Sequence, residues 1–244
     1  MAPLKVTISG IDGSGKSTSA SAVSRRLARD GLVVVHPLRR AYVDRPGRAR
    51  EYFGDPIHAV VDRTHRGFDR LGSRTAVGLV NVAYARVWRS VEAWAVARYR
   101  PDVVLSGRCS VLDGAAYAPF YFGATRALDP ARRLATSARI GGAAPPDLRF
   151  LLEVDGPVAH ARILDRIAKE RAVGVDDRQK WTHMHETPDE LTAIGRELAR
   201  CAVALPDPVI RLDAGQPQDA VVEAIVHAVR AAHRRRATLS DAPA

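Results

Sequence analysis

Short apolar runs alternate with longer amphipathic segments along the chain. The runs are rich in β-branched residues, which indicates strands, and they lie at 5–9, 31–35, 103–105, 148–154 and 209–213. The run at 31–35 is continuously apolar, as in a parallel strand that is covered on both faces. The segments between the runs have few helix breakers and apolar residues at helical spacing. Helices are predicted at 17–29, 76–99, 113–139 with an aromatic interruption, 156–171, 191–205 and 219–233.

A strand, a helix and a second strand in succession form the βαβ unit. The whole pattern therefore predicts an α/β fold, with a doubly wound and mostly five-stranded parallel sheet flanked by helices. No repeat or change of composition divides the chain, so we expect a single domain over 1–233. Residues 234–244 begin with three arginines and predict a frayed basic tail.

Two stretches depart from this alternation. Residues 37–76 are rich in arginine, glycine and proline. They form either an exposed connection with a short helix near 56–63 or an arginine-lined flap over a ligand. Residues 174–188 are polar and are expected to belong to a lid over about 155–188. This stretch holds His183, His185 and Glu186, but the spacing of its histidines is not that of a metal site.

The segment after the first strand carries the clearest chemistry. It reads Gly-Ile-Asp-Gly-Ser-Gly-Lys-Ser-Thr and matches the phosphate-loop pattern G-x-x-x-x-G-K-[ST]. Its glycines let successive N–H groups face a phosphate, and the following helix points its positive N-terminus at the same place. Lys16 would neutralise the β- and γ-phosphates, and the Ser17 hydroxyl would ligate Mg²⁺. The loop therefore predicts ATP and Mg²⁺ as cofactors. The expected contact residues are Gly10, Gly13, Ser14, Gly15, Lys16, Ser17 and Thr18.

Composition narrows the class of protein. The 244 residues are 46% hydrophobic, which suffices for a sizeable core. No apolar run approaches the roughly 18 residues of a membrane helix, and no secretory leader is expected, so we predict a cytoplasmic protein without a membrane partner. Cys109 and Cys201 fit a reducing compartment. The net charge of +10 favours anionic ligands, but no nucleic-acid motif accompanies it, and a nucleic-acid partner is not expected.

Taken in order, these motifs resemble the thymidylate kinase family of P-loop nucleoside and nucleotide kinases. The resemblance is patchy but spans nearly the whole chain, and it is most specific over 8–18, 152–157 and 212–217. It implies transfer of the γ-phosphoryl group of ATP to a nucleoside, a nucleoside monophosphate or a related modified metabolite. It also implies a helical lid and is compatible with a homodimer.

The resemblance implies roles on the ATP side of the site. Arg162 and Arg166 match the lid helix and would supply a cation to the transferring phosphoryl group. The segment that contains Asp213 and Gly215 would lie against the adenine.

On the acceptor side, Asp12 would hold the sugar hydroxyl of the acceptor. Arg86 matches the arginine that ends the acceptor-facing stretch of the family. Arg108 follows the strand at 103–105, at the edge where ligands of open α/β sheets bind. Tyr84 and Tyr117 are the aromatic candidates on this side.

Three departures from the family also lie on the acceptor side. The strand-end Asp-Arg of the family is Gly107-Arg108 here, and Asp113, which is nearer the strand end than Asp102, is the favoured replacement for the missing carboxylate. The phenylalanine that stacks on thymine is Val82, and the Arg-Glu-Pro of the family is absent. We therefore expect a kinase whose acceptor is not ordinary thymidylate. The alternative is a nucleotide-binding protein of the same fold with little or no turnover.

Overall fold

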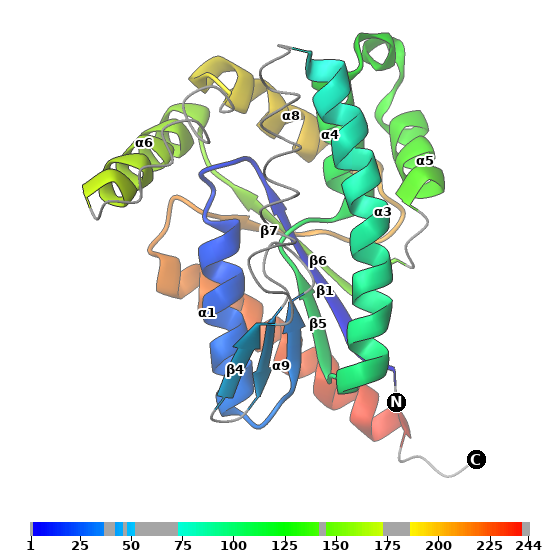
Figure 1. The fold of residues 1–244 in the computed structure, drawn as a ribbon, viewed down its shortest axis with the longest axis vertical. Coiled ribbons are helices and arrows are strands. Elements are labelled where there is room, and N and C mark those ends of the chain that lie inside the picture. The colour runs from blue at the N-terminus through cyan, green and yellow to red at the C-terminus, as the bar shows by residue number, and fades with distance from the viewer. Residues whose placement is uncertain are drawn as a thin grey trace.

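A seven-stranded sheet forms the centre of the computed structural model, which describes residues 2–36, 42–45, 48–51, 73–141, 145–172 and 186–240 (Figure 1). The strands are β1 (Leu4–Gly10), β2 (Val34–His36), β3 (Tyr42–Arg45), β4 (Arg48–Glu51), β5 (Val103–Ser106), β6 (Leu148–Glu153) and β7 (Ile210–Asp213). The helices are α1 (Lys16–Arg29), α3 (Arg74–Tyr99), α4 (Ser110–Tyr121), the 3-10 helix η1 (Gly123–Ala127), α5 (Pro130–Gly141), α6 (Gly156–Ala172), α8 (Pro188–Ala204) and α9 (Gln218–Ser240).

The predicted five-stranded parallel sheet is confirmed. Strands β2, β5, β1, β6 and β7 lie side by side in that order, and each neighbouring pair is parallel. Strand β1 is central, because it pairs with β5 on one side and with β6 on the other. The loop that follows Gly10 therefore emerges in the middle of the carboxyl edge, where open α/β sheets bind their ligands.

The remaining two strands were not predicted. Strands β3 and β4 form an antiparallel hairpin that continues the sheet beyond β2. They belong to the arginine-rich stretch at 37–76, so part of that stretch is regular sheet rather than an irregular connection. The short helix expected near 56–63 lies outside the described residues.

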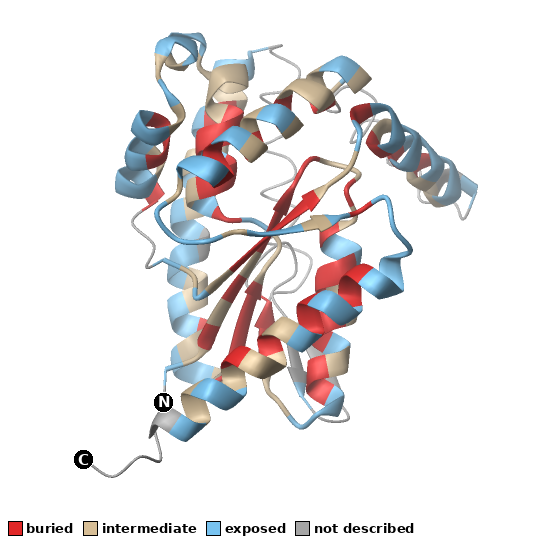
Figure 2. Cartoon of the chain, turned by 180° about the vertical axis from the view of Figure 1, so that it is seen from behind, coloured by how far each residue is buried: buried red, intermediate tan, exposed pale blue. Residues whose placement is uncertain are grey.

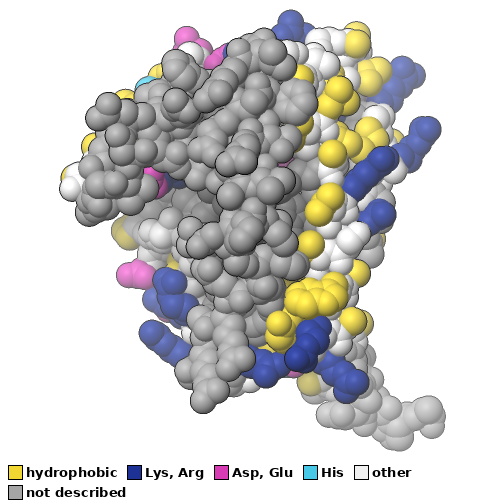
Figure 3. Space-filling model, viewed as in Figure 1, with side chains coloured by type: hydrophobic (Ala, Val, Ile, Leu, Met, Phe, Trp, Pro, Cys, Tyr) yellow, Lys and Arg dark blue, Asp and Glu magenta, His cyan; other side chains and the backbone are white. Residues whose placement is uncertain are grey.

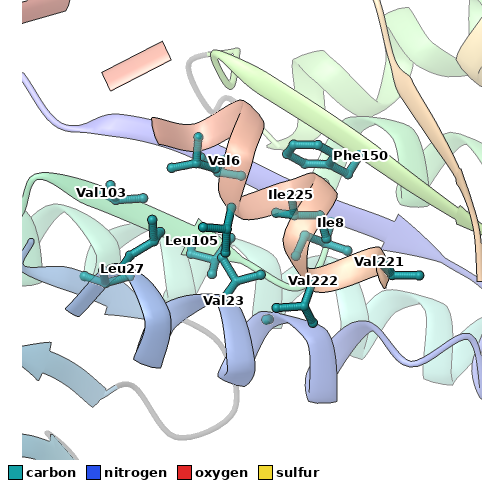
Figure 4. Packing of buried hydrophobic residues seen from close by; sticks show 14 of the residues in the cluster. Val6, Ile8, Val23, Leu27, Val103, Leu105, Phe150, Val221, Val222 and Ile225 are labelled. Carbon is teal, nitrogen blue, oxygen red and sulfur yellow. The ribbon is translucent and has the colours of Figure 1, made fainter. Parts of the chain in front are cut away.

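Two hydrophobic cores cover the two faces of the sheet. On one face, α1 and α9 pack against β1, β5 and β6 through residues such as Leu27, Ile225 and Phe150 (Figure 4). On the other face, α4, α5, α6 and α8 enclose a second cluster with Leu151 at the sheet. Successive residues of β6 thus point to opposite faces, as the period of a strand requires. Figure 2 shows the buried residues along the central strands and on the inner sides of these helices.

The C-terminal helix is longer than predicted. Helix α9 continues to Ser240, so the three arginines assigned to a frayed tail are helical. No proline or glycine interrupts 218–240, and the Arg236 guanidinium donates to the carbonyl of Pro3 at 3.1 Å and to the carboxylate of Asp147. These acceptors lie at the starts of β1 and β6, and Figure 1 shows both chain ends at this end of the molecule. None of the helices in the described ranges is long and apolar enough to cross a bilayer.

Candidate active site

The phosphate loop connects β1 to α1 with the geometry that its glycines permit. Gly13 and Gly15 have φ angles of 81° and 88°, in the left-handed region that favours glycine. No side chain caps the start of α1, and its first turn contains no acidic residue. The first N–H groups of a helix have no partner within the helix, and they form a natural site for a phosphate. Ser17 and Thr18 are exposed on this first turn.

Lys16 is held inside the loop. Its ammonium Nζ donates to the carbonyl oxygens of Gly10 and Ile11, both at 2.7 Å, and lies 3.3 Å from Asp12 Oδ1. Burial lowers the pKa of Lys16, while the nearby carboxylate of Asp12 opposes that shift. The ammonium is therefore positioned within the loop before any phosphate binds.

Asp12 joins the loop to the end of β5. Its Oδ1 lies 3.7 Å from an Nη of Arg108, which stands in the turn between β5 and α4. The structure thus brings Lys16, Asp12 and Arg108 together, although 92 residues of chain separate Lys16 from Arg108. Such a row of alternating charges suits a ligand with anionic and hydroxyl groups.

Asp113 is buried beneath this group, in the first turn of α4. Its Oδ2 accepts hydrogen bonds from the Ser9 hydroxyl and from the Cys109 N–H, both at 2.7 Å. Burial raises the pKa of Asp113, and the Ser9 hydrogen bond and the positive charges of Arg108 and Lys16 oppose that rise. Asp113, which is expected to replace the carboxylate that is missing at Gly107, therefore also joins α4 to β1.

An aromatic surface lies next to Arg108. The rings of Tyr117 and Tyr121 are stacked, with centroids 6.1 Å apart and an interplanar angle of 17°. Burial raises the pKa of both phenols, that of Tyr121 to about 12, although a hydrogen bond to Asn81 opposes the shift. Tyr117 was predicted and Tyr121 was not. Val82 is half-buried in α3.

Glu186 is a site residue that the sequence did not reveal. It directly precedes α8, and its Oε2 is buried without a hydrogen-bond partner among the described residues. Burial, followed by the negative charge of Asp12, raises its pKa to about 7. The positive charges of Arg108 and Lys16 oppose this rise. Its only signal in the sequence was its place before the capping box that Thr187 and Glu190 form at the start of α8.

The residues expected on the ATP side lie on α6 and in the turn after β7. Arg162 is exposed on α6, and Arg166 Nε is 4.0 Å from the carboxylate of Glu170 on the same helix. In the turn after β7, Asp213 Oδ1 accepts the N–H of Gly215 at 2.7 Å. The structure therefore places these residues on the expected elements.

The described contact of Arg86, a predicted acceptor residue, is made with α5 and not with the group around Asp12. Arg86 is exposed on α3, and its Nε donates to the carbonyl of Ile140 in α5 at 3.4 Å. No contact among the described residues joins it to Asp12 or Arg108. Tyr84 also belongs to α3, and its side chain lies outside the described part of the structure.

The sheet order and the phosphate loop together define a P-loop kinase fold. No family model matches the chain, and no curated protein does. Among solved structures, the chain is similar to a deoxyadenosine kinase from M. mycoides that was solved with bound dCTP. The TM-score is 0.54 at 13% sequence identity, and the match covers 93% of this chain and 100% of the other. This likeness shows the fold.

Proposed function

We propose that this protein is a kinase that transfers the γ-phosphoryl group of ATP to a nucleoside, a nucleoside monophosphate or a related modified metabolite. The observation that carries the proposal is the cluster of Lys16, Asp12 and Arg108 around an uncapped helix N-terminus, at the carboxyl edge of the sheet. Phosphoryl transfer asks a protein mainly for positioning and for neutralisation of charge, and this cluster has groups for both. The fold shared with a nucleoside kinase supports the same proposal.

On the ATP side, Lys16 and the loop N–H groups bind the β- and γ-phosphates. The exposed Ser17 hydroxyl, beside Lys16 on the first turn of α1, fits Mg²⁺, which prefers oxygen ligands and would neutralise phosphate charge. Arg162 or Arg166 supplies a further cation when the lid closes. The turn at Asp213 contacts the adenine.

On the acceptor side, Asp12 and Arg108 hold polar groups of the acceptor, with Asp113 behind them. The stacked Tyr117 and Tyr121 offer an aromatic face that Val82 lacks. This arrangement favours an acceptor other than thymidine monophosphate, as does Gly107, where the resemblance leads us to expect a carboxylate. The resemblance to the thymidylate kinase family therefore supports the proposed reaction, but it does not identify the acceptor.

The test compares ATP consumption across thymidine monophosphate, the other nucleoside monophosphates and free nucleosides, for the wild type and for Lys16→Ala. We expect turnover that chelation of Mg²⁺ abolishes and that Lys16→Ala lowers by at least about 10³-fold, because phosphate charge is no longer neutralised. ATP binding without turnover of any acceptor would favour the alternative, a nucleotide-binding protein. Turnover by Lys16→Ala at the wild-type rate would contradict the loop assignment.

A cytoplasmic location and a homodimer remain predictions. The homodimer is supported by apolar side chains on one side of α3, since Leu79 and Val87 are about 60% exposed and Trp94 is 45% exposed. Figure 3 shows hydrophobic side chains with arginines between them along this part of the surface. Sedimentation equilibrium would give twice the chain mass of 26.5 kDa for a dimer and the mass itself for a monomer.

A further inference from the structure

We propose that Glu186 accepts the proton of a hydroxyl group on the acceptor, and that the phosphoryl group is therefore transferred to a free hydroxyl and not to a phosphate. This inference rests on the proposed kinase function and identifies the class of its acceptor. Its basis is a buried carboxylate oxygen, Glu186 Oε2, that has no hydrogen-bond partner among the described residues. The Glu186 carboxylate interacts electrostatically with the proposed acceptor groups.

The surroundings of Glu186 place it in the acceptor site. It interacts electrostatically with Asp12 and Lys16 of the phosphate loop, with Arg108 after β5, and with Tyr117 and Tyr121 of α4. These groups come from three separate elements that converge at the carboxyl edge of the sheet. A carboxylate that interacts with all of them lies near both the proposed phosphate site and the proposed acceptor site.

The other carboxylates near the loop are already engaged. Asp113 Oδ2 accepts two hydrogen bonds of 2.7 Å, from Ser9 and from the Cys109 N–H. Asp12 lies beside two cations, Lys16 at 3.3 Å and Arg108 at 3.7 Å, so its carboxylate is already paired.

The strand ends offer no substitute for Glu186. Strand β5 leads into Gly107, and β2 ends at His36, which is followed by Pro-Leu-Arg-Arg-Ala. Neither sequence contains a carboxylate. Among these candidates, Glu186 alone combines a buried, unbonded carboxylate oxygen with a position at the acceptor site.

A proton acceptor is needed for only one of the two acceptor classes. The oxygen of a phosphate acceptor is already ionised near neutral pH, whereas a hydroxyl must lose its proton during transfer. In the proposed step, the hydroxyl oxygen forms a bond to the γ-phosphorus, and the bond from that phosphorus to the β–γ bridging oxygen breaks. ADP leaves with the bonding electron pair, the hydroxyl proton passes to Glu186, and water takes it up later.

The state of the Glu186 carboxyl suits this role. Burial, followed by the charge of Asp12, raises its pKa to about 7, while a hydrogen bond from its own backbone N–H and the charges of Arg108 and Lys16 oppose the rise. A base whose pKa is near the working pH combines a useful deprotonated fraction with real basicity. The carboxyl groups of Glu186 and Asp12 can both accept hydrogen bonds from hydroxyl groups of the acceptor.

The experiment measures kcat against pH for Glu186→Gln, for the wild type and for Asp189→Asn as the matched control. Asp189 is an exposed acid three residues away, in the first turn of α8. With a free nucleoside, we expect wild-type kcat to rise with pH through about 7. In Glu186→Gln, kcat should no longer rise with pH through about 7. Its kcat should also be lower by roughly 10²-fold or more, which is the size of a general-base contribution. Its Kd for ATP should be unchanged, and Asp189→Asn should resemble the wild type.

A stability measurement supplies a readout that does not depend on turnover. Because the folded pKa of Glu186 is above its ordinary value of 4.5, the carboxyl contributes stability below pH 4.5, and this contribution is lost as pH rises to about 7. The Tm of Glu186→Gln relative to the wild type should therefore be higher at pH 8 than at pH 5.

The possible results separate the two proposals. If the wild type phosphorylates nucleosides and Glu186→Gln does so at the same rate with the same rise of kcat with pH, the role of Glu186 is refuted and the kinase stands. Efficient turnover of nucleoside monophosphates alone would also refute it. If the wild type neither binds nor consumes ATP, the kinase proposal itself fails.

Discussion

Two glycines of the candidate site differ in the space around their α-carbons. A β-carbon on Gly107 would meet no atom within 4 Å, and its backbone is not in the left-handed region. A β-carbon on Gly13 would lie 2.2 Å from the carbonyl oxygen of Ala159 in α6, and its φ is +81°. The first position therefore admits the carboxylate that the thymidylate kinase family carries there, and the second admits no side chain.

We expect Gly107→Asp to change Tm by no more than about 2 °C, since position 107 is half-buried but open around the β-carbon, and a substitution without a clash or backbone strain costs within about 0.5 kcal/mol. Gly13→Ala should lower Tm by about 10 °C or more, because both a clash and an unfavourable φ must be relieved. Thermal unfolding of the two variants beside the wild type checks this. A large loss of Tm in Gly107→Asp would show that the space at Gly107 is not open.

Residues that belong to a contiguous motif were predictable, and those that meet only through folding were not. The loop around Lys16 could be identified because its glycines and flanking elements are adjacent in the sequence. The resemblance provided Asp12 and Arg108, and the structure brings them within 3.7 Å. Glu186 was considered only as part of a metal site, because its burial and its interaction with Asp12 have no counterpart in local spacing.

At the scale of elements, helix α6, which belongs to the predicted lid, is fixed at one end. Gly13 packs against the backbone of Ala159, and a β-carbon on Gly156 would meet the carbonyl of Pro188 at 2.3 Å. Ala159, Ile163 and Ile167 are buried in the core, whereas Leu164 is 53% exposed on the outer side. The turns of α6 up to Ile167 are therefore part of the body of the protein, and any lid motion of this helix is expected beyond them.

Hydrogen exchange should show this division. Without ligands, we expect slow exchange at 159–167 and faster exchange at 168–172, because exposed backbone with few apolar contacts opens more readily. ATP with an acceptor, or a bisubstrate analogue, should protect 168–172 and the rest of the predicted lid to 188, since lid closure excludes water from the γ-phosphoryl group. Protection that stays the same with and without the analogue over 160–188 would contradict the lid.

The parallel strands were predictable from their own residues, but the edge hairpin was not. The buried strands are continuous apolar runs, such as Val103, Val104 and Leu105, and such runs are typical of parallel strands that are covered on both faces. Strand β4 reads Arg-Ala-Arg-Glu, which has low intrinsic strand preference. It forms because β2 and β3 provide backbone partners at the sheet edge, and this contribution from tertiary structure leaves no pattern in the sequence.

At the scale of the whole molecule, many arginines join elements that are distant in sequence. Arg230 of α9 makes two hydrogen bonds, of 2.7 and 2.8 Å, to Asp30 at the end of α1. Buried Arg149 of β6 pairs with Asp207 at 2.9 Å. The net charge of +10 therefore coexists with many specific ion pairs, and a basic composition alone did not reveal which arginines face a ligand.

Arg236 also joins elements that are distant in sequence, and it links the two ends of the described chain. It donates to the carbonyl of Pro3, at the start of β1, and pairs with Asp147, just before β6. Asp147 also accepts the N–H of Lys5 at 2.7 Å, so the arginine completes a small network that covers the amino ends of two central strands. The last turns of α9 therefore contribute to the stability of the sheet.

Truncation of the chain after residue 233 should consequently destabilise the protein, by about 1–2 kcal/mol for the charged hydrogen bonds of Arg236 alone. Arg236→Ala should reproduce most of the loss in Tm. Truncation after Ser240 keeps every described contact of α9 and serves as the control, with an expected Tm equal to that of the full chain. If the protein truncated after 233 unfolds at the same temperature as the control, then residues 234–240 contribute nothing to stability and act as the free tail predicted from their sequence.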